Sequence, residues 1–391
     1  MVTEYPGTTR RTPGQRFAVR FGGTLMKPHR FLLVCVLLGL LVAPFQAIAG
    51  DGGYHVLPYA SGLEAPRGLT IDANGHLVAA LNGSGDGHRD SRIVRFQDLN
   101  GDWMADNGAE MQDLVNGMPT ASFRPGVAFG GQAIHGIGDV QFSAEGEIYF
   151  LTGAFEADRS LAQWHAIWST AAPPVYGNPL ITANPYANFW AYELANNPDG
   201  SIIESLPYAL VLDANNNAYV SDAAANTIWL VTPEGVVSTF AVLPTTTNTS
   251  GTGAAQIHTV PTGLVWGPDG ALYMGSETGG PFPEGASAVW RLSDDNGDGD
   301  AMDAGEMSQY ATGLTTVTDI AFDHDGRLLA LEFRGFLKGE DWSSGRVMRQ
   351  TDTGWEVLAG GLTTPTGMAI GWDGTIYVTL EYIGQIVQIR Q

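Results

Sequence analysis

Two segments of equal length carry acidic side chains at the spacing of calcium-binding loops. The first reads RFQDLNGDWMADNGAEM, and the second, RLSDDNGDGDAMDAGEM, follows it by 196 residues. Oxygen-bearing side chains alternate at positions 1, 3 and 5 of each loop, and a glutamate follows. The predicted ligands are Asp98, Asn100, Asp102 and Glu110 in the first loop and Asp294, Asn296, Asp298 and Glu306 in the second. Because Ca²⁺ takes roughly six to eight oxygen ligands, the sequence predicts calcium as a structural cofactor.

Two features of these loops leave an alternative open. The glutamate stands at position 13 rather than 12, and Trp103 occupies the turn position that Gly299 occupies in the second loop. The alternative is a pair of solvated hairpin tips in which the Asp and Asn side chains cap their own backbone.

A repeated unit indicates the elements that must position these loops. Six copies of an apolar strand, an Asn/Asp-Gly type of turn and a second strand are legible, and successive copies start 48 to 71 residues apart. They read GLTIDANGHLVAAL from Gly68, DVQFSAEGEIYFLT from Asp139, ALVLDANNNAYVSD from Ala209, GLVWGPDGALYMGSE from Gly263, DIAFDHDGRLLALE from Asp319 and GMAIGWDGTIYVTLE from Gly367. Each interval accommodates a four-stranded meander, and no long amphipathic helix interrupts the pattern. The sequence therefore predicts an all-β, six-bladed β-propeller.

The two ends of the repeat region predict how the ring closes. After the sixth copy only one further strand, QIVQIR, remains, whereas the first copy is preceded by an extra strand, YHVLPYASGLEAP. We expect this N-terminal strand to become the outer strand of the sixth blade, which removes an open sheet edge.

The propeller topology predicts a candidate site at one mouth of the central channel. Residues that end the second strands and residues that begin the first strands share that face. The candidate ligand-binding residues there are Arg67, His135, Asp139, Tyr208, Asp222, His258, Glu277, Asp319, Glu332 and Glu381, with Asn82 beside them. Convergent polar groups at a concave mouth are typical of a ligand site. The alternative is that these strand-end acids are only solvated.

Two classes of function fit this mouth. A binding module would hold a small molecule, a glycan or a protein without turnover, and the lack of a recognisable nucleophile motif favours it. An enzyme would be a lactonase-like hydrolase that holds a metal with Glu277, Glu332 and Glu381. It could also be a quinoprotein-like dehydrogenase that clamps its cofactor with basic residues, for which Arg67, Arg124 and Arg334 are the candidates.

The N-terminal region resembles a signal peptide. Lys27 and Arg30 precede an apolar run, and Ala47 and Ala49 fit a cleavage site before Gly50, so we expect residues 1–49 to be a leader with its start at Met26. Residues 50–391 then form the exported propeller, in the periplasm, cell envelope or exterior, with no stable membrane insertion. Cys35 lies in the leader, so the mature chain has no disulfide. The net charge of −22 disfavours nucleic acid as a partner and favours cations.

Several longer segments resemble one protein family. They are YELANNPDG, PYALVLD, VPTGLVWGPDGALYMGSETGGPFPEGASAVWRL, YATGLTTVTDIAFDHDGRLLALE and ASGLEAPRGLTID, which look like the ScyD/ScyE family, named from the gene cluster for the sunscreen pigment scytonemin. The resemblance covers nearly all of the chain after the leader. It implies an exported propeller of the NHL-like class, and it assigns no catalytic residue.

Overall fold

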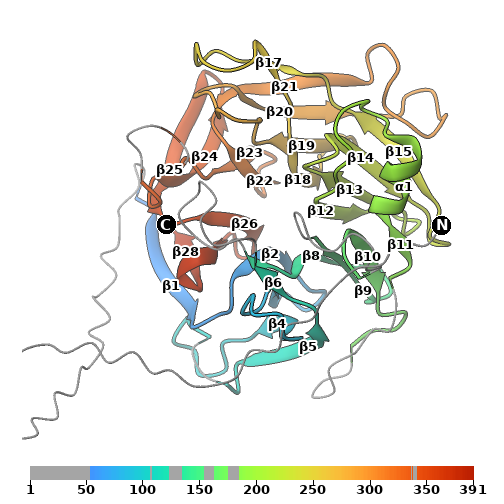
Figure 1. The fold of residues 1–391 in the computed structure, drawn as a ribbon. Coiled ribbons are helices and arrows are strands. Elements are labelled where there is room, and N and C mark those ends of the chain that lie inside the picture. Colours follow the sequence, from blue (N-terminus) through green and yellow to red (C-terminus); the bar gives the residue numbers. More distant parts are fainter. Residues whose placement is uncertain are drawn as a thin grey trace, which may run out of the picture. The chain divides into compact units, whose positions relative to one another are not determined.

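The structure is a ring of six antiparallel sheets. This computed structural model describes residues 53–105, 108–122, 134–153, 163–174, 185–335, 337 and 341–391, all within one compact unit, Phe45–Gln391. Each of the six sheets has four strands, and Figure 1 shows the first strand of each sheet nearest the centre. The predicted six-bladed β-propeller is therefore confirmed.

The first three blades follow the chain order from the centre outward. Blade one contains β2 (Pro66–Ile71), β3 (Leu77–Leu81), β4 (Ser91–Phe96) and β5 (Met111–Met118). Blade two contains β8 (Ile137–Phe142), β9 (Ile148–Thr152), β10 (Ala166–Ser169) and β11 (Ala187–Asn188). Blade three contains β12 (Pro207–Leu212), β13 (Ala218–Asp222), β14 (Thr227–Val231) and β15 (Val237–Val242).

Blades four and five repeat this arrangement, and blade six closes the ring. Blade four contains β18 (Pro261–Trp266), β19 (Leu272–Ser276), β20 (Ser287–Leu292) and β21 (Met307–Leu314). Blade five contains β22 (Val317–Phe322), β23 (Leu328–Glu332), β24 (Gly345–Thr351) and β25 (Gly354–Leu362). Blade six contains β26 (Pro365–Ile370), β27 (Ile376–Leu380), β28 (Gln385–Arg390) and, outermost, β1 (His55–Ser61).

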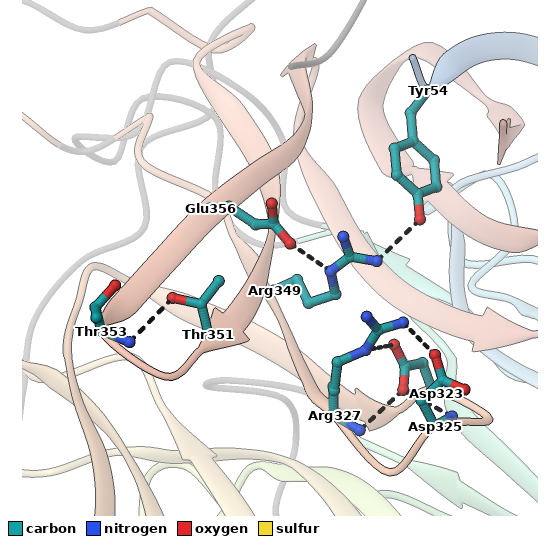
Figure 2. A network of polar contacts seen from close by, with 8 residues as sticks. All are labelled: Tyr54, Asp323, Asp325, Arg327, Arg349, Thr351, Thr353 and Glu356. Carbon is teal, nitrogen blue, oxygen red and sulfur yellow. Dashed lines mark hydrogen bonds and ion pairs between the residues drawn. The ribbon is translucent and has the colours of Figure 1, made fainter. Parts of the chain in front are cut away.

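The N-terminal strand closes the ring as the sequence predicts. β1 pairs antiparallel with the C-terminal strand β28, with Val56 opposite Ile389. Figure 2 shows that Tyr54, just before β1, also reaches the neighbouring blade: its hydroxyl accepts a hydrogen bond of 3.0 Å from Arg349 of β24. Arg349 in turn donates to Glu356 at 2.6 Å. The first strand of the propeller is thus joined to the last strand by a shared sheet, and Tyr54 adds a side-chain contact to blade five.

The apolar core lies between blades rather than at the centre of the ring. Each of the six buried clusters among the described residues combines strands of two neighbouring blades. Val78 of blade one packs with Phe150 of blade two, for example. The first strands, which surround the central axis, line the channel with both polar and apolar side chains.

The turns between first and second strands confirm the repeat reading. The six turn residues Gly75, Gly146, Asn216, Gly270, Gly326 and Gly374 all have positive φ. Glycine and asparagine adopt that conformation at low cost, which explains why the Asn/Asp-Gly pattern recurs.

A β-bulge at the same place in every first strand shapes the channel. Pairing with the second strand shifts register just after Pro66, Ile137, Pro207, Pro261, Val317 and Pro365. The residues that follow these positions are Arg67, Gly138, Tyr208, Thr262, Thr318 and Thr366. A bulge redirects a side chain that a regular strand would place on one of its faces.

Smaller elements decorate the ring. The hairpins are β6 (Ala121–Ser122) with β7 (Ile134–His135), and β16 (Thr246–Thr247) with β17 (Gln256–Ile257). Two short helices are α1 (Phe189–Asn196) and the 3₁₀ turn η1 (Glu381–Ile383). Within the described ranges no helix has the length and apolar character needed to cross a membrane. The predicted leader, residues 1–49, lies outside the described residues.

Candidate functional site

A cavity of about 430 Å³ occupies the channel between the first strands. Four predicted site residues line it: Arg67, Asp139, Tyr208 and Asp319. Arg67 and Tyr208 stand at equivalent bulge positions of blades one and three, and the guanidinium carbon lies 4.6 Å from the centre of the Tyr208 ring. This cation–π contact orients the arginine within the channel.

Two glutamates, from blades four and six, act on this arginine. Glu277 follows β19 and Glu381 follows β27, so both stand at second-strand ends as predicted. Burial lowers the pKa of Arg67, but Tyr208, Glu381 and Glu277 outweigh that effect and raise it. Burial raises the pKa of Glu277 to about 7, against an opposing attraction from Arg67. Glu381 likewise has a raised pKa because it is buried.

The hydrogen bonding of these two carboxylates is sparse. Glu381 accepts one hydrogen bond, of 3.3 Å, from the amide of Asn82. Among the described residues no hydrogen bond or ion pair to the Glu277 carboxylate is observed. Both side chains are partly exposed, so solvent can hydrogen-bond their remaining oxygens, and neither residue lines the cavity.

Asn82 and His135 add further unsatisfied groups beside Glu381. Asn82 is fully buried and donates to the carbonyl of Ile134 at 2.9 Å, yet its side-chain oxygen has no partner among the described residues. His135 is only 7% exposed, and within the same part of the chain neither of its ring nitrogens has a partner. Burial, followed by repulsion from Arg67 and His165, lowers the pKa of His135 to about 3, so the ring is neutral.

Asp139 and Asp319 are related by a repeat within the ring. Asp139 of blade two accepts from its neighbour Val140 and from Leu210 of blade three, both at 2.8 Å. Asp319 of blade five accepts in the same way, from Ile320 at 2.8 Å and from Met368 of blade six at 2.7 Å. Each carboxylate thus ties its own first strand to the next one.

Burial still dominates the protonation of this pair. It raises the pKa of Asp139 to about 7, against the backbone hydrogen bonds and Arg67. It raises the pKa of Asp319 to about 8, and repulsion from Asp139 acts in the same direction. The two carboxyl groups therefore have a structural role, and near neutral pH bound protons neutralise much of their charge.

The backbone around Glu277 departs from the usual conformations of L residues. Thr278 has φ of 75° and Val260, whose carbonyl accepts a 3.0 Å bond from the Glu277 amide, has φ of 57°. β-branched residues rarely adopt this conformation. Positive φ recurs at Ala65, Thr316 and Thr364 beside other first strands, so the conformation of Val260 belongs to the repeat.

Two other predicted acids have a different environment. Asp222 is fully buried and accepts from Ser205 at 2.5 Å, Leu206 at 2.6 Å and Trp229 at 3.1 Å. Because both oxygens of Asp222 have hydrogen-bond donors, Asp222 has a structural role at the end of its strand. Glu332 is also fully buried.

Glu332 is held by basic and backbone donors. Arg346 donates to one of its oxygens at 2.5 Å and the Thr315 amide to the other at 2.7 Å. Arg334 lies 3.7 Å from the same carboxylate and pairs with Glu284 at 2.9 Å. The placement of Glu332 thus resembles that of Asp222 and favours a structural role.

His258 lies at a separate pocket of about 330 Å³. Its Nε2 atom is 3.2 Å from the Ser201 hydroxyl. His258 does not line the channel cavity, and Arg124 lies outside the described residues.

The acidic loops have the hydrogen bonding of the alternative interpretation. Asp98 accepts from the amides of Gly101 and Trp103 at 2.7 and 2.8 Å, and Asp294 accepts from Gly297 and Gly299 at 2.7 and 2.9 Å. The later glutamates, Glu110 and Glu306, are buried and also accept backbone amides. Within the described ranges no group of three His, Cys, Asp or Glu side chains is arranged to hold a metal. Calcium binding stays a prediction.

Some channel features could not be read from the sequence motifs. The bulge positions carry unlike residues, so their common role emerges only from strand register. Gly138 is one of them, and a Cβ atom added there would meet nothing closer than the Tyr208 carbonyl oxygen at 4.0 Å. In the sequence, these bulge positions are marked by Pro-x-Gly and Thr-Asp patterns at the start of the first strands.

Comparison with known proteins supports the fold alone. No protein-family model and no curated protein sequence matches the chain. A protein of unknown function from Bacteroides thetaiotaomicron has a TM-score of 0.52 and 10% identity, over 86% of this chain and 75% of that one. A gluconolactonase from Xanthomonas campestris has a TM-score of 0.49 and 12% identity, over 88% and 93%. The PQQ-bound aldose sugar dehydrogenase from Streptomyces coelicolor has a TM-score of 0.48 and 12% identity, over 88% and 99%.

Proposed function

We propose that this protein is an exported binding module that holds a small molecule in its central channel. The ligand would occupy the cavity between the first strands, beside Arg67, Tyr208, Asp139 and Asp319. The observation that carries the proposal is this cavity itself, which brings an arginine and two carboxyl groups from different blades to one apolar-walled space.

The size of the cavity supports this proposal. Its volume of about 430 Å³ falls within the range of small-molecule sites, roughly 300 to 1,000 Å³. Its lining also combines apolar side chains with a few polar groups, which is typical of such sites.

The geometry favours binding over the enzymatic alternatives. A metal-dependent hydrolase that uses Glu277, Glu332 and Glu381 needs free oxygens on Glu332, and these accept from Arg346 and Thr315. A quinone clamp would use Arg334, which is already paired with Glu284. Two parts of the proposal rest on the sequence alone: export, and the resemblance to the ScyD/ScyE family.

A steric block of the channel tests the proposal. Gly138 lines the cavity and has room for a side chain, so Gly138→Met should fill the channel without removing a charged group. Gly138→Ala is the matched control. In a thermal-shift screen of small metabolites, we expect compounds that stabilise the wild type and Gly138→Ala but not Gly138→Met. The proposal fails if every stabilising compound acts equally on Gly138→Met, or if no compound distinguishes the three proteins.

A further inference from the structure

We infer that a pocket outside the channel is a hydrolytic site, in which Ser201 is the nucleophile and His258 the general base toward a small carboxylic ester. This activity goes beyond the proposed function. The two residues line a separate pocket of about 330 Å³, and neither lines the channel cavity. Three features of the pocket carry the inference: the contact between the two side chains, the restraint of each residue by the fold and the composition of the shared wall.

The Ser201 hydroxyl and the His258 ring are placed as a nucleophile and its base. Ser201 Oγ lies 3.2 Å from His258 Nε2, within the range of roughly 2.6 to 3.2 Å at which an imidazole accepts the proton of an attacking hydroxyl. Both residues are half-buried and line the pocket, so the pair is accessible to a substrate. The two residues are 57 positions apart in the chain, so the tertiary fold brings them together.

A hydrogen-bonded turn after α1 restrains Ser201. Its amide donates to Asp199 Oδ1 at 2.8 Å, and its carbonyl accepts from the side-chain amide of Asn197 at 3.0 Å. Gly200 has φ of 68°, a conformation that glycine adopts at low cost. Such restraint favours a nucleophile, because a small displacement of the reacting atoms slows a reaction strongly.

His258 is restrained by the end of blade four. Its carbonyl accepts from the Gly279 amide at 2.9 Å, and the carbonyl of Thr259 accepts from the Thr278 amide at 3.0 Å. The segment that donates these bonds directly follows β19, which pairs with β18 and β20 inside the sheet. The imidazole is therefore carried by a backbone that is tied to the propeller.

Two backbone amides can stabilise the charge that develops during acyl transfer. Ala224 and Gly280 line the same pocket, and among the described residues neither of their amides donates an observed hydrogen bond. Attack on an ester places negative charge on the carbonyl oxygen, and backbone N–H groups are common donors to such an oxyanion. These two amides are available for that role.

The wall of the pocket indicates the class of ester. Its apolar side chains are small or aliphatic: Ile202, Ala223, Ala224, Ile257 and Val260. Glu204 also lines the pocket, so a neutral ester is favoured over an anionic one. The volume of about 330 Å³ lies near the lower end of small-molecule sites, roughly 300 to 1,000 Å³. A short acyl group fits these limits.

The reaction needs no reactant besides the ester and water. Ser201 Oγ attacks the carbonyl carbon while its proton passes to His258 Nε2, and the bond to the alcohol oxygen breaks as that oxygen takes the proton. A water molecule then attacks the acyl-serine carbon and gives one proton to His258. The bond to Ser201 Oγ breaks, the hydroxyl recovers that proton and the carboxylic acid leaves.

Covalent labelling tests the nucleophile. Diisopropyl fluorophosphate phosphorylates activated serines with loss of fluoride, and peptide mass spectrometry locates the adduct. In the full mature protein we expect an adduct on Ser201, and in His258→Gln a labelling rate lower by at least about a hundredfold. An unlabelled wild type, an adduct only at other residues, or equal labelling of His258→Gln would overturn the inference.

Hydrolysis of 4-nitrophenyl acetate provides a second readout. Ser201→Ala should lose at least about a hundredfold in kcat/KM. The matched control is Ser84→Ala, which removes an exposed hydroxyl outside this pocket and should equal the wild type. Thermal unfolding establishes that each variant is folded. A wild-type rate no higher than that of Ser201→Ala would contradict the inference.

The Gly138→Met variant separates this site from the channel. It fills the channel cavity and leaves the Ser201 pocket unchanged, so it should hydrolyse the ester like the wild type. Lost ligand binding with intact hydrolysis would support both the proposed function and the hydrolytic site. Lost hydrolysis in folded Gly138→Met would place the reaction in the channel and overturn the inference.

Discussion

The channel and the two acidic loops both contain Asp and Glu side chains, but these side chains have different environments. In the loops, the carboxylates of Asp98 and Asp294 accept amides from their own turns, and Asp102 and Asp298 are exposed to solvent. In the channel, Glu277 and Asp319 are held where burial raises the pKa of both. Local turn chemistry therefore satisfies the loop acids, whereas the closure of the ring collects the channel acids around one arginine.

This difference teaches that acidic composition alone does not locate the site. The loops have the most recognisable motif, yet Asp98, Asp102, Asp294 and Asp298 all accept backbone amides of their own turns. The channel acids Asp139 and Asp319 also depend on an amide of the next blade. A site depends on where polar groups remain uncompensated after folding.

The largest expected effect comes from the channel carboxylates that join two blades. Asp319→Ala would leave the amides of Ile320 and Met368 without their acceptor, and each buried orphan amide costs about 1–3 kcal/mol. We expect a loss of roughly 2–5 kcal/mol in the free energy of unfolding, measured with urea. The equivalent Asp139→Ala should behave alike.

The loop residue Asp298 is the matched comparison for that measurement. Because Asp298 is exposed, Asp298→Ala without added calcium should cost less than about 1 kcal/mol. Equal losses for Asp298→Ala and Asp319→Ala would abolish the distinction between the two regions.

An effect of comparable size per residue is expected in the dependence of stability on pH. The folded-state pKa values of Asp139 and Glu277 are raised to about 7 and that of Asp319 to about 8, so between pH 4 and 8 the folded protein binds more protons than the unfolded chain. These groups stabilise the fold at low pH, and their contribution is lost as pH rises through 7 and 8. We expect each of the three groups to lower the free energy of unfolding by roughly 3 kcal/mol between pH 5 and 8.

Glu277→Gln isolates one part of this pH effect. The amide has no charge to bury, so the variant should be more stable than the wild type at pH 8 and nearly equal to it at pH 5. Asp298→Asn should shift the curve little at either pH. A Glu277→Gln curve parallel to that of the wild type would show that Glu277 is compensated in the folded protein.

The smallest expected effect concerns calcium in the loops. If the predicted loops bind Ca²⁺, chelation should lower the melting temperature by a few degrees, because a ligand bound only by the folded state stabilises it. Asp298→Ala should remove most of this response, and Asp102→Ala would report separately on the first loop. An unchanged melting temperature with chelator would leave the loops as hydrogen-bonded turns.

The sequence predicted the fold in detail for a physical reason. Repeated Asn/Asp-Gly turns and apolar strands are local signals, and the incomplete sixth blade required the N-terminal strand that pairs as β1 with β28. Strand order also placed Glu277 and Glu381 on the predicted face. The state of each side chain was not predictable, because it depends on contacts between blades.

Three residues illustrate this limit. Glu332 looks like Glu277 in sequence, but Arg346 of the adjacent strand neutralises it. The buried amide of Asn82 is held by the carbonyl of Ile134, in a strand that follows the first blade. The space for a side chain at Gly138 results from the shift of strand pairing at the β-bulge. None of these properties has a periodic or motif signature.

The protonation of the channel carboxylates tests the central claim most directly. A ¹³C titration of the Asp and Glu side-chain carboxyl groups, for the wild type and Glu277→Gln without ligand, would follow each group. The account predicts a small set of resonances with midpoints near pH 7 to 8, from which Glu277→Gln removes one. Titration of every carboxyl group below about pH 5 would show that the channel charges are fully compensated, and would contradict the account.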